Sequence, residues 1–357
     1  MADQASPIAF FLTLHQMRRL LPLLLAAALF AACGDGQQQP TPEGPDFTAV
    51  ATPTFCADSA YQYVARQLAF GVRAPGSKGH QQCAQYLVSA MRQWCDTVVV
   101  QEFTAVLWNG DTYRGQNIIC SLDPAKSERV LLGAHWDSRL WADHDASEAN
   151  HRKPIMGAND GASGVGTLME MARVMSGQRP RVGVDIVFFD MEDQGTPEWA
   201  DSDAPDAWCL GSQYWARNPH RPFYNARYGI LLDMVGTRQP RYTREEFSRH
   251  YAPGIVEKLW RAASQMGHGN VFVERDTDPI LDDHLYVNRL ANIPMVDIVQ
   301  NSDGCSFFPY WHTLEDDLSC IDAQSLKTTA DVVLKVIYQY ESGEWGMESG
   351  EWGEIRF

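Results

Sequence analysis

Short apolar runs bounded by polar residues alternate along the chain with segments whose apolar residues recur at helical spacing. Several of the runs are apolar throughout, which is typical of strands buried on both faces of a parallel sheet. The pattern predicts strands over residues 97–103, 115–121, 130–134, 184–189, 228–232 and 295–299. It predicts helices over residues 57–70, 80–94, 164–175, 209–217, 253–266 and 323–340. This alternation indicates an α/β fold, a single sandwich with helices on both faces of the sheet.

The first apolar run belongs to a targeting segment and not to the fold. An Arg pair at 18–19 precedes apolar residues 20–32, a run too short to span a bilayer. Small residues directly before Cys33 resemble the lipobox of bacterial lipoproteins, in which this cysteine becomes the lipidated first residue. We therefore expect a signal peptide over 1–32, with Met17 as an alternative start, and an exported lipoprotein that is anchored to the membrane through Cys33 and faces the periplasm. An ordinary secretory signal with an incidental Cys33 is the alternative.

Chain length and the composition of the two ends set the domain organisation. The 357 residues would allow two domains of about 150 residues each. However, residues 33–53 are polar and proline-rich, which is typical of a tether. Residues 341–357 hold a Gly- and Glu-rich duplication, which predicts a flexible tail. The alternative is that its Trp residues dock on another surface. A single folded domain over 54–340 therefore accounts for the rest of the chain, and a second domain is not needed.

Charge and cysteine content exclude several classes of function. Asp and Glu total 45 against 29 Lys and Arg, a formal net charge of -16 that argues against nucleic acid as a partner. Apart from Cys33 the chain has an odd number of cysteines, so at least one stays unpaired in an oxidising compartment. No CxxC motif occurs, which argues against a structural zinc knuckle or a thioredoxin-type redox site.

Residues of metal-ligand type follow the predicted strands, where open α/β sheets form their sites. They are His135 and Asp137 after strand 130–134, Asp160 before helix 164–175, Glu192 and Asp193 after strand 184–189, Asp233 after strand 228–232, and Trp311 and His312 beyond strand 295–299. Histidines and carboxylates at strand ends suit a zinc site with nitrogen and oxygen ligands. Each of these motifs alone could have a purely structural role: an Asp-Gly pair could form a turn, a histidine could be a structural residue, and an acidic pair could lie on a solvated surface. Their co-occurrence at successive strand ends favours a site.

In this order the residues resemble the zinc aminopeptidases with co-catalytic metals, and within them the glutaminyl cyclase branch, over about residues 55–340. The resemblance implies a three-layer α/β/α sandwich with a mostly parallel, mixed central sheet. It also implies that Glu192 is the general acid/base, that Asp193 is a zinc ligand and that Asp137 orients His135. Most family members have Glu at the position of Asp193, so this chain departs from the pattern there and has a shorter ligand.

Three features resemble the cyclases more than the peptidases. Trp311 directly precedes His312, where cyclases carry an indole that walls the pocket. The segment around Asp282 resembles a cyclase segment in which this Asp joins a network of carboxylates. The insert 194–208 is similar to that of bacterial cyclases of lipoprotein type, and Trp199 within it would be a second pocket wall. Core packing is the alternative for Trp199.

The resemblance implies a glutaminyl-peptide cyclotransferase, which converts the N-terminal Gln of peptides or proteins into pyroglutamate and releases ammonia. Its single zinc ion would be held by Asp160, Asp193 and His312. Glu192 would take a proton from the substrate amine and pass it to the departing ammonia. Asp233 and Asp282 would be its catalytic neighbours, and the chain is expected to act as a monomer.

Two other functions stay open at this point. In a di-zinc aminopeptidase, His135 and Asp233 would hold a second zinc ion, Asp160 would bridge the pair, and Glu192 would deprotonate water for peptide hydrolysis. All of these residues are present in the chain. The third hypothesis is a non-catalytic surface binding protein on the same fold, and the presence of Glu192 with a full ligand set argues against it.

Overall fold

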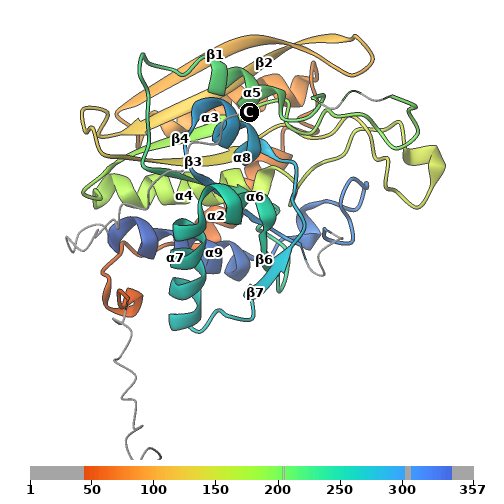
Figure 1. Ribbon diagram of the computed structural model, residues 1–357. Coiled ribbons are helices and arrows are strands. Elements are labelled where there is room, and N and C mark those ends of the chain that lie inside the picture. The colour runs from red at the N-terminus through yellow and green to blue at the C-terminus, as the bar shows by residue number, and fades with distance from the viewer. Residues whose placement is uncertain (1–43, 203, 205, 302–306, 340–357) are drawn as a thin grey trace, which may run out of the picture. The chain divides into compact units, whose positions relative to one another are not determined.

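The computed structural model describes residues 44–202, 204, 206–301 and 307–339 (Figure 1). The predicted signal peptide, the lipidation site Cys33, most of the tether and the tail over 341–357 lie outside these residues, so what the sequence predicts for them stays a prediction. Among the described helices, none combines the length and the hydropathy that a bilayer span requires.

Six strands form the central sheet, in the order β1-β2-β4-β3-β5-β8. Their bounds are Thr97–Val106 (β1), Thr112–Leu122 (β2), Arg129–His135 (β3), Gly183–Phe189 (β4), Tyr228–Asp233 (β5) and Met295–Val299 (β8). Strands β4, β3, β5 and β8 run parallel to one another, whereas β2 pairs antiparallel with both β1 and β4. The sheet is therefore mixed and mostly parallel, and the predicted fold class is confirmed.

Helices cover both faces of this sheet (Figure 1). One face carries α2 (Ala57–Leu68), α3 (Lys78–Met91), α4 (Ala162–Gly177), α7 (Pro253–Gln265) and α9 (Ala323–Gln339). The other face carries α5 (Leu210–Arg217), α8 (Asp283–Tyr286) and the π-helical turn Val287–Ala291. Short 3-10 turns lie at Phe47–Ala49, Glu148–Asn150 and Leu318–Cys320.

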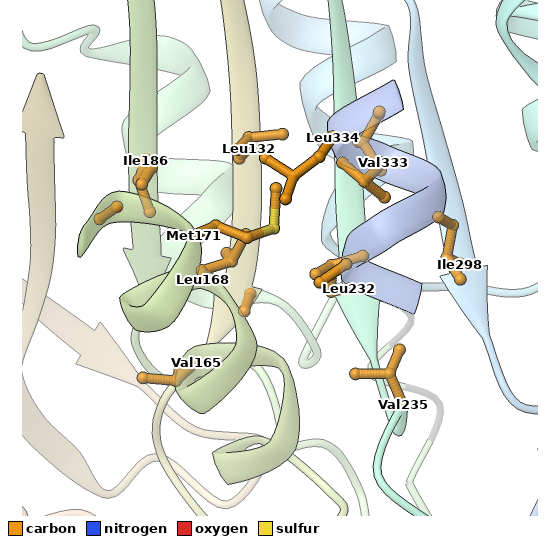
Figure 2. Packing of buried hydrophobic residues seen from close by; sticks show 14 of the residues in the cluster. Leu132, Val165, Leu168, Met171, Ile186, Leu232, Val235, Ile298, Val333 and Leu334 are labelled. Atoms are coloured by element: carbon orange, nitrogen blue, oxygen red, sulfur yellow. The ribbon is translucent and has the colours of Figure 1, made fainter. Parts of the chain in front are cut away.

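The alternation of side chains along the strands produces one hydrophobic core on each face. Figure 2 shows Leu132, Ile186, Leu232 and Ile298 of the strands packed with Val165, Leu168 and Met171 of α4 and with Val333 and Leu334 of α9. On the opposite face, Leu131, Val187 and Leu231 pack with Trp215 of α5. Because β3, β4, β5 and β8 are buried on both faces, their sequences are continuous apolar runs.

The region after β5 contains elements that the sequence pattern did not predict. Strands β6 (Tyr242–Glu245) and β7 (Phe272–Thr277) form a separate two-stranded parallel sheet with a register shift, and α6 (Glu246–Tyr251) follows β6 directly. Glu245 caps α6, because its carboxylate accepts the backbone N–H groups of Phe247 and Ser248. Strand β6 is short and β7 is largely exposed, so neither produces an apolar run.

A buried ion pair joins β3 to β4 at the ends where these strands begin. The Arg129 guanidinium donates to both carboxylate oxygens of Asp185 at 2.5 and 2.6 Å. The hydroxyls of Ser121 and Tyr224 also donate to Asp185, at 2.5 and 2.9 Å. The two charged side chains are only 1% and 0% exposed, so each depends on the other for compensation of its charge.

Replacing Asp185 with Asn should leave the Arg129 charge inside the protein without a carboxylate, a loss that typically costs about 3–5 kcal/mol of unfolding free energy. Urea unfolding followed by circular dichroism measures this loss. Glu102→Gln is the control, because Glu102 pairs with Arg114 at the surface and the two side chains are 54% and 80% exposed; it should change the free energy little. Equal stability of Asp185→Asn and the wild type would contradict this role of the pair.

Candidate functional site

The carboxyl ends of β3, β4 and β5 meet at one edge of the sheet, because these strands are parallel neighbours. His135 is the last residue of β3 and Asp233 is the last residue of β5. Glu192 and Asp193 follow β4 after a turn at Met191, which has a φ of 60°. The topology of the sheet therefore places four of the predicted site residues close together at this edge.

Two loops complete this group of side chains. Asp160 lies directly before Gly161 and α4, and His312 lies between β8 and the turn Leu318–Cys320. Gly161 has a φ of 92°, and a Cβ there would come within 2.8 Å of the Asp137 carbonyl oxygen. The turn that presents Asp160 therefore requires glycine.

The potential metal ligands form two groups that share Asp160. His312 Nε2 lies 3.0 Å from Asp193 Oδ1 and 3.7 Å from Asp160 Oδ2. His135 Nε2 lies 3.0 Å from Asp160 Oδ1 and 3.2 Å from Asp233 Oδ1. Within each group of three residues, one ligand atom per residue lies within 4.8 Å of the others.

The group of Asp160, Asp193 and His312 fits a zinc ion. All three residues are buried, and Asp160 Oδ2 and Asp193 Oδ2 have no hydrogen-bond partner. Burial and the charge of Arg139 hold the pKa of His312 well below its usual value, so the imidazole is neutral and can offer a lone pair. Neutral imidazole nitrogen and carboxylate oxygen are usual zinc ligands. The shorter Asp193 side chain still reaches this group.

Nearby positive charges do not offset the effect of burial on the pKa values of the carboxyl groups around the site. Burial raises the pKa of Asp193 well above its usual range. Burial also raises the pKa of Glu192 well above its ordinary value, an effect that His135 opposes and Asp282 reinforces. Burial raises the pKa of Asp233 to about 7. A cation or bound protons must therefore compensate this cluster.

A cavity of about 350 Å³ opens in front of these groups. Its polar lining residues include Asp160, Glu192, Asp193, Asp233, Asp282 and His312, and its apolar lining residues include Trp208, Met234, Ile280, Leu281, Phe307 and Trp311. The Trp311 ring stacks on His312 with centroids 3.7 Å apart, and Trp208 lies nearly parallel to the same imidazole at 6.0 Å. The lining of the cavity therefore combines carboxyl groups with aromatic rings.

Trp199 is not among the residues that line this cavity. Its ring lies 6.2 Å from the rings of Trp141 and His151, and the Arg152 guanidinium packs over it at 5.0 Å. Trp208, at the other end of the same insert, forms the wall that the sequence analysis assigned to Trp199. Which of these two tryptophans lines the cavity depends on the path of the loop that carries them. No local pattern in the sequence predicts that path.

The model of peptidase family M28 matches residues 117–337 of the chain. The chain belongs to peptidase family M28. Tannerella forsythia glutaminyl cyclase, a solved structure, is 50% identical over 80% of this chain and 99% of its own, with a TM-score of 0.78. A Zn-dependent exopeptidase from Parabacteroides distasonis is 48% identical over 81% of this chain and 99% of its own, with a TM-score of 0.79. The glutaminyl-peptide cyclotransferase of Bos taurus is 25% identical over 74% of this chain and 76% of its own length.

A buried arginine ties together two site loops of this M28 family member. The Arg73 guanidinium donates to the carbonyl oxygens of Trp136, Met156 and Gly157, at 2.8, 2.7 and 2.7 Å. These bonds join the loop that follows β3 to the loop that leads into Asp160. Sequence reasoning missed Arg73, because all three acceptors are backbone atoms far away along the chain.

Arg139 and Asp143 support two of the candidate zinc ligands. Arg139 donates to both carboxylate oxygens of Asp143 at 2.7 and 2.6 Å, and to the Asp193 carbonyl oxygen at 3.0 Å. Asp143 Oδ1 lies 3.5 Å from Nδ1 of His312, whose Nε2 faces Asp193. At this distance Nδ1 has no hydrogen bond, and a closer approach of Asp143 would orient the ring and strengthen it as a ligand. Sequence reasoning missed this pair too.

Replacing Asp143 with Asn should lower the affinity for zinc about 10–100-fold, because the carboxylate behind His312 is lost. Competition with a chromophoric chelator measures the zinc affinity. Glu198→Gln is the control: the backbone N–H of Glu198 donates to Asp143, whereas its side chain is 68% exposed. Unchanged zinc affinity in Asp143→Asn would rule out this supporting role.

Proposed function

We propose that this protein is a zinc-dependent glutaminyl cyclase, which converts the N-terminal Gln of peptides or proteins into pyroglutamate and releases ammonia. The observation that carries the proposal is the 50% identity to the Tannerella forsythia glutaminyl cyclase over 80% of the chain. The aromatic cavity with Glu192 beside the candidate zinc ligands supports the same function.

Asp160, Asp193 and His312 are the residues that would hold one zinc ion. When bound, zinc supplies a Lewis acid that polarises the γ-amide carbonyl of the substrate and stabilises the negative charge developing on its oxygen. Arg139 and Asp143 would orient these ligands from behind.

Glu192 is the residue that would move the proton. Its carboxylate takes a proton from the substrate α-amine, whose lone pair forms the new C–N bond to the γ-carbonyl carbon. The same carboxyl returns the proton to the amide nitrogen as the old C–N bond breaks, and ammonia leaves. Burial, with the charge of Asp282 adding to it, raises the pKa of Glu192 and so suits it to both steps. Asp233, on the same cavity, would attract the substrate amine.

The aromatic wall of the cavity would favour cyclisation over hydrolysis. Trp208, Phe307 and Trp311 line the same cavity as the carboxyl groups, so a Gln side chain bound there would displace water from the carbonyl that reacts. The nucleophile belongs to the substrate and is held close to its target, which lowers the entropic cost of attack. The reaction therefore needs neither an activated water nor a second metal.

A di-zinc aminopeptidase is the alternative, and a specific observation favours it. His135, Asp160 and Asp233 form a second group of ligand atoms within 4.8 Å of one another. In that enzyme Asp160 would bridge two zinc ions and Glu192 would take a proton from water. The similar Parabacteroides distasonis protein is described as a Zn-dependent exopeptidase.

The experiment that tests the proposal incubates zinc-loaded protein with a peptide that begins with Gln and, separately, with an amino-acid anilide. We expect ammonia and a pyroglutamyl peptide from the first substrate, no cleavage of the second, and a single zinc ion per chain. Glu192→Gln should lower the rate about 10²–10⁴-fold. It should keep its zinc, because Glu192 is not one of the three proposed ligands.

Two results would contradict the proposal. Anilide cleavage by protein with two zinc ions per chain, together with no ammonia from the Gln peptide, would establish the aminopeptidase instead. Loss of zinc from Glu192→Gln would mean that the roles of Glu192 and Asp193 are exchanged.

We also propose that the protein is exported and acts as a monomer that is anchored through a lipidated Cys33 and faces the periplasm. The support for export and for the lipid anchor is the sequence alone, an Arg pair and an apolar run that ends in small residues before Cys33. Cys33→Ser should move the protein from the membrane fraction to the soluble fraction. Unchanged partition of the variant would refute the lipid anchor.

A further inference from the structure

A buried thiol contacts the candidate general base. The Cys209 thiol donates to Glu192 Oε1 at 3.3 Å, and the backbone N–H of Cys209 donates to the Glu192 carbonyl oxygen at 2.8 Å. Cys209 is fully buried and has a left-handed backbone conformation, with a φ of 56°, at the start of α5. The two bonds hold the sulfur against Glu192.

Asp282 completes a group of three ligand atoms. Its Oδ1 accepts the backbone N–H of Asp283 at 2.5 Å, whereas its buried Oδ2 has no hydrogen-bond partner. One ligand atom each of Glu192, Cys209 and Asp282 lies within 4.8 Å of the others. Glu192 and Asp282 both line the cavity, so a cation can reach them from solvent.

We propose that Cys209, Glu192 and Asp282 form a second metal site that takes a thiophilic divalent cation, such as cadmium or zinc in excess of the resident ion. Tetrahedral zinc–sulfur and zinc–oxygen bonds of about 2.0–2.3 Å place the ligand atoms of one ion about 3.3–3.8 Å apart. The pair of Cys209 and Glu192 is already at such a distance, and the other pairs need to close by at most about 1.5 Å. A sulfur ligand selects zinc and softer cations over magnesium and calcium.

This site is separate from both groups of ligands that include Asp160. It uses none of Asp160, Asp193 and His312, and it uses neither His135 nor Asp233. Its occupation leaves the resident zinc in place under either of the functions considered above.

Occupation of this site inhibits the enzyme. The thiol proton of Cys209 leaves to water as the sulfur lone pair binds the cation, and no electron is transferred. The Glu192 carboxylate is then a metal ligand and can no longer take a proton from the substrate amine. The inhibition rests on the proposed function, whereas the binding does not.

The test titrates cadmium into the zinc-loaded protein in the absence of substrate. Equilibrium dialysis counts bound cadmium and zinc, and the ultraviolet charge-transfer band of cadmium thiolate reports the sulfur ligand. We expect one added cadmium per chain with the band, and retention of the resident zinc. Cys209→Ala and Cys209→Ser should lose the band, whereas Cys56→Ala, which removes a half-buried thiol outside this group, should keep it.

Inhibition is then measured against the uninhibited rate of each variant. The cadmium concentration that halves the rate should rise about tenfold or more in Cys209→Ala and Cys209→Ser, and stay unchanged in Cys56→Ala. Circular dichroism and zinc content identify any variant that fails to fold.

Three results would overturn the second site. They are a wild-type protein without the thiolate band, a Cys209→Ser variant that keeps the band, and equal inhibition of Cys209→Ser and the wild type. If the protein had no cyclase activity, the proposed function would fall, while the band and the bound cadmium would still decide the second site.

Discussion

Carboxylates buried at the carboxyl end of the sheet are the constraint on which the rest of the site depends. A buried charge is strongly destabilising unless other charges or hydrogen bonds compensate it. Asp137 is compensated by the backbone N–H groups of Glu192 and Asp193, at 3.1 and 3.2 Å. Asp316 accepts the backbone N–H groups of Asn159 and Asp160, at 2.8 and 3.1 Å. Each of these bonds also fixes the loop that carries a potential ligand.

The carboxylates without such partners give the site its chemistry. Asp160 and Asp193 keep unpartnered buried oxygens beside His312, and a cation satisfies them better than any nearby side chain of the described structure. Because the candidate ligand atoms come from separate loops, binding of a metal there would stabilise the folded arrangement as well as the reaction. Such binding would couple the stability of the site to the ion that its proposed function requires.

Most of the fold was predictable because β3, β4, β5 and β8 are buried on both faces and so stand out as apolar runs. His135, Glu192, Asp193 and Asp233 were predictable as candidate site residues for a related reason, since they lie at the ends of those runs or shortly after them. Strands β6 and β7 were missed because a short strand and an exposed strand leave no such pattern. Trp208 was missed as a residue that lines the cavity, and Cys209 was missed as a neighbour of Glu192, because packing of the loop that precedes α5 places them there.

The sequence by itself determined the class of fold, the family resemblance and the residue types available for a zinc site, since these follow from periodicity and from local order along the chain. Only the tertiary structure decided which of those residues share a metal group, that Trp208 and not Trp199 walls the cavity, and that Arg73, Arg139 and Asp143 support the site. The physical reason is distance along the chain. Contacts between residues far apart in sequence arise only when the loops are packed on the sheet. Local patterns in the sequence therefore do not predict them.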